Sequence, residues 1–343
     1  MKNQIKTQPV TTELKTNRRS PYFSVGSGPA RSPMFAAISV AAALIAATPL
    51  TSLGDTIVVP SGSIVTIQDG VDAAAPGDTI KVLAGTYASG VVVATPRLKL
   101  KAVTRTGRVI VSSGFTIVAD QVEIEGFDFD AGVTGIYING ADQVVVAKNH
   151  IVADRFAIIV DGADRVRVSG NTGVARNGIS VDSSSNVQID HNTLLARISA
   201  ISVNNSSGTH VDYNETSGED AINIGGSSDT HFDHNFVSAA RNGINVFGSI
   251  GTHVEHNRVE AFTGILVSSS SAGQIAHNTL ATTGTGIRVS ADSCGNEFKH
   301  NSVRSSRSLA ELESFDDPAA PCNSYKNNDA DTAFPSLAFW DVK

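Results

Sequence analysis

The chain has 343 residues, of which 17% are charged and 6% are aromatic, with 30 glycines and a net charge of −7. This length exceeds one ordinary compact domain, so either two domains or a solenoid is expected. Frequent Val, Ile, Thr, Ser and Asn favour β-structure with small turn residues. The acidic charge argues against a nucleic-acid partner, which would need a basic stripe, but it is compatible with a local basic patch for another polyanion.

Residues 35–47 form an uncharged apolar run that follows a basic segment. The run is too short to span a bilayer comfortably and matches the apolar core of a secretory signal. We therefore expect residues 1–50 to be an export leader that begins at Met1 or at Met34, with an uncleaved membrane anchor as the alternative. The mature protein would be secreted or periplasmic, without a stable membrane span.

Side chains of the same type recur at a nearly constant interval through the middle of the chain. One column consists of isoleucines, each preceded by Gly or Ala and followed two positions later by Ile or Val: Ile136, Ile158, Ile179, Ile201, Ile222, Ile244, Ile265 and Ile287. A second column consists of asparagines: Asn149, Asn171, Asn192, Asn214, Asn235, Asn257, Asn278 and Asn301. A period of about 22 residues is typical of a repeat architecture.

Each repeat contains three short segments in which apolar residues alternate with other residues, which predicts strands. The first strand is small-Ile-x-Val, the second is Val-x-Ile-x-x-Asn, and the third is a short segment around residues such as Ile151 and Leu194. Repeats of this kind stack in parallel and bury their apolar sides on one another. The sequence thus predicts an all-β fold, a parallel β-helix over residues 56–303, with about ten rungs after residue 79. The recurring Asn should form a hydrogen-bonded ladder at a tight turn.

Both ends of such a coil need a cover, because an open rung exposes backbone groups and apolar core. At the N-terminal end, apolar residues at helical spacing precede a Pro-Gly pair, which predicts a short capping helix over residues 66–76. Residues 304–343 lose the repeat and contain the lone Trp340, so we expect them to form a C-terminal cap.

Two cysteines, Cys294 and Cys322, lie near the C-terminal end of the repeats. A disulfide between them would fit an exported protein and would hold the last turns together. Two free buried thiols or a metal-binding pair are the alternatives, and two cysteines without clustered spacing make a metal site the weaker one.

The segment TIQDGVDAAAPGDTIKVLAGTY at residues 66–87, followed by repeats such as NVQIDHNTLL, resembles pectate-lyase-like β-helix proteins. The resemblance covers residues 56 to about 303 and implies a right-handed parallel β-helix. That superfamily includes pectate, alginate and chondroitin lyases, mannuronan C5-epimerases and a periplasmic accessory protein for nitrous oxide reductase assembly, so the fold does not choose among these functions. The Asp-Pro-His signature of the epimerases is absent, as is any recognisable lyase signature.

In that superfamily the substrate groove lies along the first strand and the corner that precedes it. By position, the outward-facing residues of the first strands are Tyr137, Ile159, Ser180, Ser202, Asn223, Asn245, Leu266 and Arg288. The preceding corners supply Arg155, Arg176, Arg197, Glu219, Asp220 and Arg241. A row of guanidinium groups in consecutive rungs would match a uronic-acid polymer laid along the coil, because Arg binds carboxylates through two parallel hydrogen bonds.

The predicted function is therefore binding of an acidic polysaccharide, with modification by C5 proton abstraction as in a lyase or C5-epimerase. The predicted catalytic residues are Arg176, Arg197 and Arg241. The predicted substrate contacts are Arg155, Tyr137, Ser180, Ser202, Asn223 and Asn245. The predicted Ca²⁺ ligands are Asp161, Asp182, Glu219 and Asp220. No base is evident and the turns are short, which favours a non-catalytic carbohydrate-binding or surface protein as the alternative; a monomer is expected.

Eight of the nine histidines fall in two columns. One column precedes the ladder Asn, with a tyrosine in one rung: His191, Tyr213, His234, His256, His277 and His300. The other lies three positions earlier: His210, His231 and His253. Acidic residues lie between the two columns: Asp190, Asp212, Asp233 and Glu255. Such groups bind Zn²⁺ or Cu²⁺, so a periplasmic metal-handling accessory protein is a further alternative; a turn residue copied from rung to rung is the purely structural interpretation.

Overall fold

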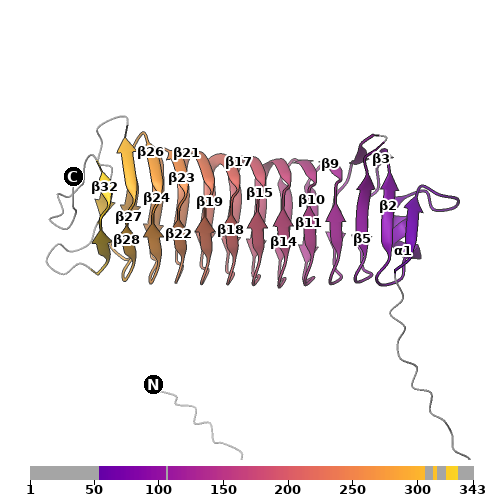
Figure 1. The fold of residues 1–343 in the computed structure, drawn as a ribbon, viewed down its shortest axis with the longest axis horizontal. Helices are drawn as coiled ribbons and strands as arrows, with labels where there is room; N and C mark the ends of the chain where they lie inside the picture. The colour runs from indigo at the N-terminus through magenta and orange to yellow at the C-terminus, as the bar shows by residue number, and fades with distance from the viewer. Residues whose placement is uncertain (1–53, 106, 306–311, 315–321, 331–343) are drawn as a thin grey trace, which may run out of the picture. The chain divides into compact units, whose positions relative to one another are not determined.

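The computed structural model describes residues 54–105, 107–305, 312–314 and 322–330. The predicted export leader and most of the predicted C-terminal cap lie outside these residues. In the described part the chain coils into a parallel β-solenoid, with the rungs stacked in chain order (Figure 1). The all-β parallel solenoid predicted from the repeat is therefore confirmed. No helix in this part of the chain is long and apolar enough to cross a bilayer.

One sheet of the solenoid has 13 strands. It contains the second strands of the repeats, together with strands that lie before the first repeat and after the last one. These strands are β1 (Thr56–Val59), β2 (Thr79–Leu83), β5 (Lys99–Val103), β8 (Glu123–Glu125), β11 (Val145–Ala147), β14 (Arg167–Ser169), β16 (Gln188–Asp190), β18 (His210–Asp212), β20 (His231–Asp233), β22 (His253–Glu255), β25 (Gln274–Ala276), β28 (Glu297–Lys299) and β31 (Ser324–Lys326). Each pairs in parallel with the strand one rung away, as the repeat predicts.

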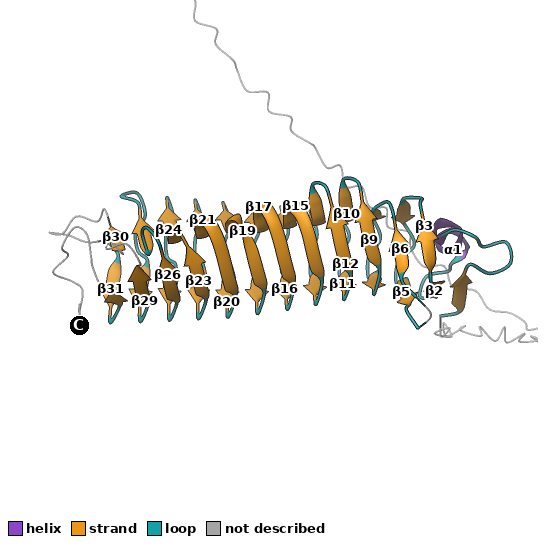
Figure 2. Ribbon diagram, turned by 90° about the horizontal axis from the view of Figure 1, so that it is seen from above, coloured by secondary structure: helices purple, strands orange, loops and turns teal. Residues whose placement is uncertain are grey.

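The other sheet has 19 strands and combines the third and first strands of the repeats (Figure 2). Separate third strands are β3 (Gly85–Tyr87), β6 (Val109–Val111), β9 (Asp128–Ala131), β12 (His150–Ala153), β23 (Arg258–Ala261), β26 (Thr279–Thr282), β29 (Ser302–Ser305) and β32 (Asp329–Ala330). Separate first strands are β4 (Val91–Val93), β7 (Phe115–Ile117), β10 (Thr134–Asn139), β13 (Phe156–Asp161), β24 (Thr263–Ser268), β27 (Ile287–Val289) and β30 (Leu312–Ser314). In four central rungs a third strand runs on into a first strand, as β15 (Thr172–Asp182), β17 (Thr193–Asn204), β19 (Glu215–Gly225) and β21 (Phe236–Phe247).

The corner between the third and first strands is where the rungs differ in length. From Ile136 to Asn278, the separation between each recurring Ile and the ladder Asn that follows it is constant. The separation between that Asn and the next Ile instead alternates, being longer by a single residue in every second rung. The extra residue therefore lies at this corner, and the strand register shifts there in each pair of long strands. These shifts are β-bulges, which bend a strand and redirect the side chains beside them.

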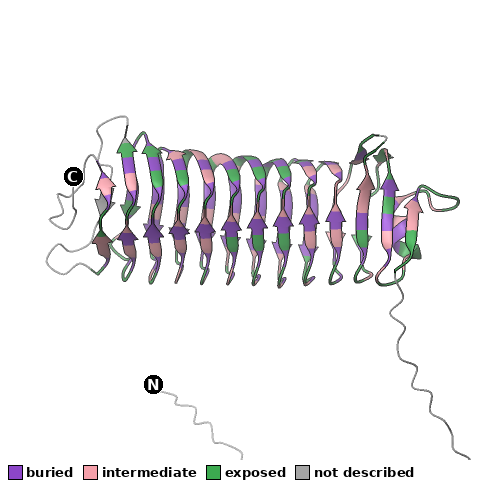
Figure 3. Cartoon of the chain, in the orientation of Figure 1, coloured by how far each residue is buried: buried purple, intermediate pink, exposed green. Residues whose placement is uncertain are grey.

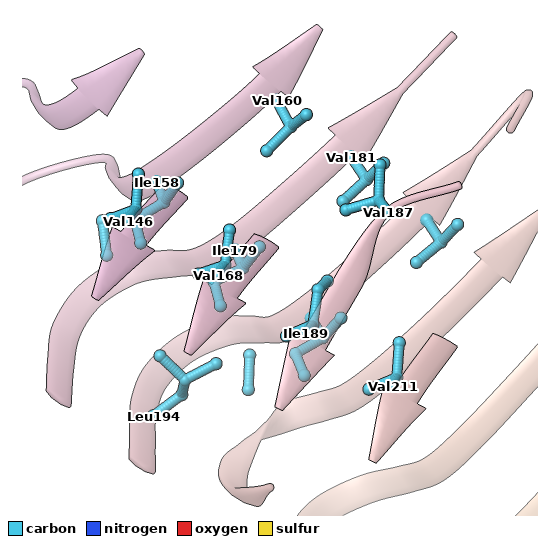
Figure 4. Close-up of a cluster of buried hydrophobic side chains, with 14 of the residues drawn as sticks. Val146, Ile158, Val160, Val168, Ile179, Val181, Val187, Ile189, Leu194 and Val211 are labelled. Carbon is cyan, nitrogen blue, oxygen red and sulfur yellow. The ribbon is translucent and has the colours of Figure 1, made fainter. Parts of the chain in front are cut away.

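The recurring Ile and Val residues form the core of the solenoid (Figures 3 and 4). Ile158, Ile179 and Ile201 are each at most 1% exposed, and their strand partners are one another in successive rungs. Since side chains alternate between the two faces of a strand, the residue after each Ile points outward. The core therefore fixes which residues line the outer surface.

The predicted asparagine ladder is present and continues beyond Asn301 to Asn328. The Nδ2 of Asn192 donates to Asn214 Oδ1 at 3.0 Å and to the carbonyl oxygen of Val168 at 2.9 Å, and the ladder Asn residues are 0 to 3% exposed. The residue before most ladder positions adopts a left-handed conformation, for example His234 with φ of 53°. The ladder therefore fixes the turn at which the first histidine column stands.

At the N-terminal end the structure contains a helix, α1 (Ile67–Ala73), inside the range predicted for a cap. The Thr66 hydroxyl accepts from the Asp69 backbone N–H, and the Asp69 carboxylate accepts from the Thr66 backbone N–H, which satisfies two N-terminal donors of the helix. Ile67 and Val71 are buried and belong to the solenoid core.

At the C-terminal end, β30, β31 and β32 pair in parallel with β27, β28 and β29. Parallel pairing thus continues for one rung past residue 303. The expected disulfide is present between Cys294 and Cys322, whose Cα atoms lie 5.1 Å apart. It links the turn before β28 to the turn before β31.

Candidate functional site

The candidate site lies on the face formed by the first strands and the corners that precede them. Arg176, Arg197 and Glu219 each lie within the register shift of a long strand, between Ala175 and Asn177, between Leu195 and Ile201, and between Gly218 and Asp220. All three side chains are exposed. The bulges therefore present the predicted ligand-contacting residues at the outer edge of the corner.

Three arginines in consecutive rungs form a row, which we call the arginine row: Arg155, Arg176 and Arg197. The pairing of β13 with β15 aligns Arg155 with Arg176, and β17 carries Arg197 on the next rung. Adjacent parallel strands lie about 4.8 Å apart. All three are exposed, and none has a carboxylate within ion-pair distance among the described residues. The Cζ of Arg155 lies 5.7 Å from the centre of the Phe156 ring.

Several arginines elsewhere on the solenoid are paired. Arg108 lies 2.8 Å from Asp128, and Arg167 lies 3.1 Å from Asp190. Arg258 likewise lies 2.8 Å from Glu260. The arginine row differs from these positions because, within the part of the chain that the structure describes, no carboxylate compensates its three positive charges.

Arg241 belongs to the same corner two rungs further on, but its environment is different. Its Nε donates to Asp220 Oδ1 at 2.9 Å, and its Nη2 contacts Asp220 Oδ2. Asp220 is 8% exposed and also accepts from the Asn242 backbone N–H and side-chain amide. Hydrogen bonding to Asp220 raises the pKa of Arg241, with the nearby Glu219 carboxylate, 3.7 Å from Nε, adding to the effect. Arg241 and Asp220 thus compensate one another.

The outward residues of the first strands form a half-buried polar column beside the arginine row. Ser202 Oγ lies 2.9 Å from Ser199 Oγ, and the Asn223 amide donates to the same Ser199 oxygen at 3.0 Å. The Asn245 amide donates to Asn223 Oδ1 at 3.3 Å, and the buried Oδ1 of Asn245 has no partner among the described residues. Ser180 pairs in register with Ser202. These four predicted contacts are therefore brought together.

Tyr137 lies on the same column but two rungs before Ser180, with Ile159 between them. Its hydroxyl donates to Asp161 Oδ2 at 3.3 Å. Partial burial raises the pKa of Tyr137, and the Asp161 carboxylate adds to this effect. The apolar Ile159 therefore separates Tyr137 from the other predicted contacts.

A shallow hollow of about 500 Å³ lies at the far end of the first strands. It is lined by Ser180, Asp182, Asn204, Asn205, Gly225, Gly226, Phe247 and Gly248. Asp182 accepts from the Asn205 amide at 3.1 Å, and the Phe247 ring is 51% exposed at the rim. Sequence reasoning predicted Ser180 and Asp182 here but missed the asparagines and Phe247. Phe247 occupies a position that holds Asp, Asn, Gly or Ser in other rungs. This departure from the repeat was the signal in the sequence that could have identified it.

The four predicted Ca²⁺ ligands do not form one cluster. Asp161 and Asp182 are register partners three positions after the core Ile, whereas Asp220 lies two positions before it. Five positions along a strand correspond to about 16 Å. Carboxylates separated by this distance cannot bind the same ion. In addition, the Asp220 carboxylate already accepts hydrogen bonds from Arg241 and Asn242.

The histidine columns form two stacks of parallel rings on another face, along the second strands and the asparagine turn. In one stack, His234 and His256 have ring centres 4.9 Å apart, and in the other, His231 and His253 have ring centres 4.6 Å apart. Tyr213 takes its place in the first stack, 4.9 Å from His234. Asp212 of β18 and Asp233 of β20 are register partners and lie between the two columns in the sequence.

The fold and this surface define a class of protein. A family model described as the right-handed β-helix region matches residues 104–218 and 177–317, so the chain belongs to that family. The resemblance seen in the sequence is thereby confirmed at the level of the superfamily. Among curated proteins, no sequence matches significantly.

Solved structures with the same fold come from several sources. DFA-IIIase from Arthrobacter chlorophenolicus A6 is 14% identical over 79% of this chain and 94% of that chain, with a TM-score of 0.57. PfbA, a surface adhesin of Streptococcus pneumoniae, is 11% identical over 76% and 86%, with a TM-score of 0.54. The Dettilon tailspike protein (gp208) is 12% identical over 75% of this chain and 65% of its own, with a TM-score of 0.53. At these identities the similarity shows the fold alone.

Proposed function

We propose that the protein acts outside the cytoplasm and binds an acidic polysaccharide along the first strands and the corners that precede them. The observation that carries this proposal is the arginine row: Arg155, Arg176 and Arg197 are exposed, consecutive and without a carboxylate partner among the described residues. Uncompensated guanidinium groups on a protein of net charge −7 are a localised site for an anion.

The spacing of the row selects a polymer rather than a small anion. Arginines carried by rungs about 4.8 Å apart could each bind one carboxylate of a chain laid along the solenoid. Beside them, the half-buried Ser180, Ser202 and Asn223 offer hydroxyl and amide groups to sugar hydroxyls. Charge would thus select the acidic sugar, and the polar column would orient it.

Support for an extracellular location comes from the chain itself. The predicted leader precedes the solenoid. The chain also contains the Cys294–Cys322 disulfide, and in most proteins disulfides persist only in an oxidising compartment. The adhesin PfbA, a surface protein, shares the fold, which makes a binding role without turnover compatible with this architecture.

A more specific part of the proposal is that the protein also catalyses a reaction of the bound polysaccharide. In C5 proton abstraction, Arg176 and Arg197 would bind the uronate carboxylate and stabilise the negative charge that develops on it. A base is also required, and Glu219 is an exposed carboxylate of the same corner. Arg241, bound to Asp220, would position that corner, and its predicted catalytic role stays a prediction.

Affinity electrophoresis through gels containing alginate, polygalacturonate or a neutral glucan tests the binding. We expect retardation only by the acidic polymers, weakening with salt. Replacing all three arginines of the row by Gln should reduce affinity by roughly 100-fold, since an exposed ion pair contributes up to about 1 kcal/mol and the three together about 3 kcal/mol. The matched control is Arg108→Gln/Arg167→Gln/Arg258→Gln, which removes the same charge from paired positions. Equal losses in the two triple variants would show a net-charge effect and refute the site.

The same samples test turnover. Incubation with each polymer, with and without Ca²⁺, is followed by ultraviolet absorbance for unsaturated uronates and by proton NMR for C5 inversion. Product formation that is lost in Glu219→Gln, with retardation unchanged, would support catalysis at this corner. Retardation without any product would leave binding as the function.

A further inference from the structure

A second polar face, separate from the arginine row, is formed by β20, β22 and the turns that follow them. Asp233 is the last residue of β20, His234 follows it at the turn, and His256 occupies the same turn one rung later. Asp233 Oδ1 lies 2.9 Å from His234 Nδ1 and 3.1 Å from His256 Nδ1. One ligand atom from each of the three residues lies within 4.8 Å of the other two.

The backbone explains why these atoms converge. His234 and His256 are both left-handed, with φ of 53° and 52°, and their rings are nearly parallel, 8° apart in plane. Successive rungs therefore present the same ring edge in the same direction. The Nδ1 atoms of two rungs face the Asp233 carboxylate, which lies on the strand just before the turn.

Neighbouring rungs lack one part of this arrangement. Asp190 and His191 form a similar pair at 3.1 Å, but the next rung has Tyr213, whose phenol replaces the second imidazole. Glu255 is followed by His256 and His277, but its Oε1 contacts the Gln274 amide. Within the described residues, only Asp233, His234 and His256 form such a three-ligand group.

We propose that Asp233, His234 and His256 bind one divalent transition-metal ion of the Zn²⁺ or Cu²⁺ class. Two imidazole nitrogens and one carboxylate oxygen form a borderline donor set, unlike the all-oxygen sets that Ca²⁺ and Mg²⁺ prefer. In a tetrahedral site with bonds of about 2 Å, the ligand atoms are about 3.3 Å apart. The 2.9 and 3.1 Å contacts are already close to this value, and side-chain rotation would bring the two nitrogens together.

The site is accessible to an ion from solvent. The three side chains are 39 to 45% exposed. Three protein ligands leave at least one coordination position for water or for a group from a bound molecule. The competing explanation is that each Nδ1–H donates a hydrogen bond to Asp233 and that the group only stabilises the turn.

Calorimetric titration of the full chain, purified without a polyhistidine tag, separates the two explanations. Zn²⁺, Cu²⁺, Ca²⁺ and Mg²⁺ are each titrated in a non-coordinating buffer. We expect saturable binding of one Zn²⁺ or Cu²⁺ per chain and none of the other two ions. Asp233→Asn/His256→Asn should weaken this binding at least tenfold. Asn fits these positions because it tolerates the left-handed conformation that residue 256 requires.

The matched control is His191→Asn/His300→Asn, which removes two rings from the same column and should leave the affinity unchanged. Far-ultraviolet circular dichroism establishes that both double variants retain the β-helix. For Cu²⁺, electron paramagnetic resonance should show two coordinated nitrogens in the wild type and one in His256→Asn. Absence of saturable uptake by the wild type, or equal affinity in Asp233→Asn/His256→Asn, would overturn the proposal.

Discussion

Arg241 donates its Nε–H to the almost fully buried carboxylate of Asp220, and its Nη2 contacts the second oxygen of the same carboxylate. One carboxylate thus contacts two nitrogen atoms of a guanidinium group from the next rung. Asn242 adds two further hydrogen bonds to that carboxylate. The pair joins two rungs at the corner where their lengths differ.

Asp220→Ala should therefore destabilise the solenoid. It leaves Arg241 without its partner and removes an acceptor from two Asn242 donors, which together should cost about 2–3 kcal/mol of unfolding free energy. Thermal unfolding followed by circular dichroism measures the change. Glu219→Ala, an exposed neighbour, should stay within about 0.5 kcal/mol of the wild type. Similar shifts in both variants would contradict a structural role for Asp220.

Asn192→Ala tests the ladder. Its Oδ1 accepts from the backbone N–H and the amide of Asn171 at 2.9 and 3.0 Å, and its own amide donates to Asn214. Truncation leaves buried donors and an acceptor unpaired, so we expect a loss of about 3 kcal/mol. Hydrogen exchange at the Asn171 amide should also accelerate. The adjacent exposed Thr193→Ala serves as control, and unchanged exchange in Asn192→Ala would argue against the ladder as a source of stability.

The solenoid could be predicted from the sequence because stacking requires like residues at like positions, and the Ile and Asn columns display this directly. The position of the arginine row followed from the same counting. That these arginines have no carboxylate partner among the described residues could not be predicted, since any acidic side chain from an adjacent rung could have compensated them. Arg241 shows this: its residue type and its corner match those of Arg176, but Asp220 lies one rung away from it.

One feature was present in the sequence but needed the structure to be recognised, and another could not be read from the sequence. The alternating separation between the ladder Asn and the next Ile marks the bulged corner. Counting from the core Ile would also have separated Asp182 from Asp220. The convergence of Asp233, His234 and His256 depends on left-handed backbone angles, which spacing alone does not specify.

Removal of the disulfide should loosen the last described rung rather than the whole solenoid. Cys294 and Cys322 close a loop with a sequence separation of 28 residues, for which chain entropy gives about 3.6 kcal/mol. In a repeat protein each rung contacts mainly its neighbours, so the effect should stay local. Limited proteolysis of Cys294→Ser/Cys322→Ser should cut faster within residues 294–305 and 322–330, as mapped by mass spectrometry. Addition of reductant should reproduce this in the wild type and have no effect on the variant; cleavage spread along all rungs would contradict a local role.

The environment of Glu125 predicts a pH dependence of the stability of the solenoid, and its sign follows from the direction of the pKa shift. Hydrogen bonds from Lys101 and then Lys148, at 2.8 and 2.7 Å, lower the pKa of Glu125 to about 2. Because the folded pKa lies below the unfolded value of about 4.5, the stabilisation is complete above that value and is lost as the pH falls towards about 2. Both ammonium groups are partly exposed and screened by solvent, so we expect only about 1 kcal/mol.

Thermal unfolding of Glu125→Gln against the wild type checks this expectation. The variant should be less stable near neutral pH, and the two melting temperatures should converge as the pH is lowered through the interval between the two pKa values. Lys148→Gln removes one of the two donors and should show a smaller difference with the same direction of pH dependence. A gap between wild type and Glu125→Gln that stays constant from neutral pH down to about pH 2 would mean that the carboxylate charge is not the source of the stability.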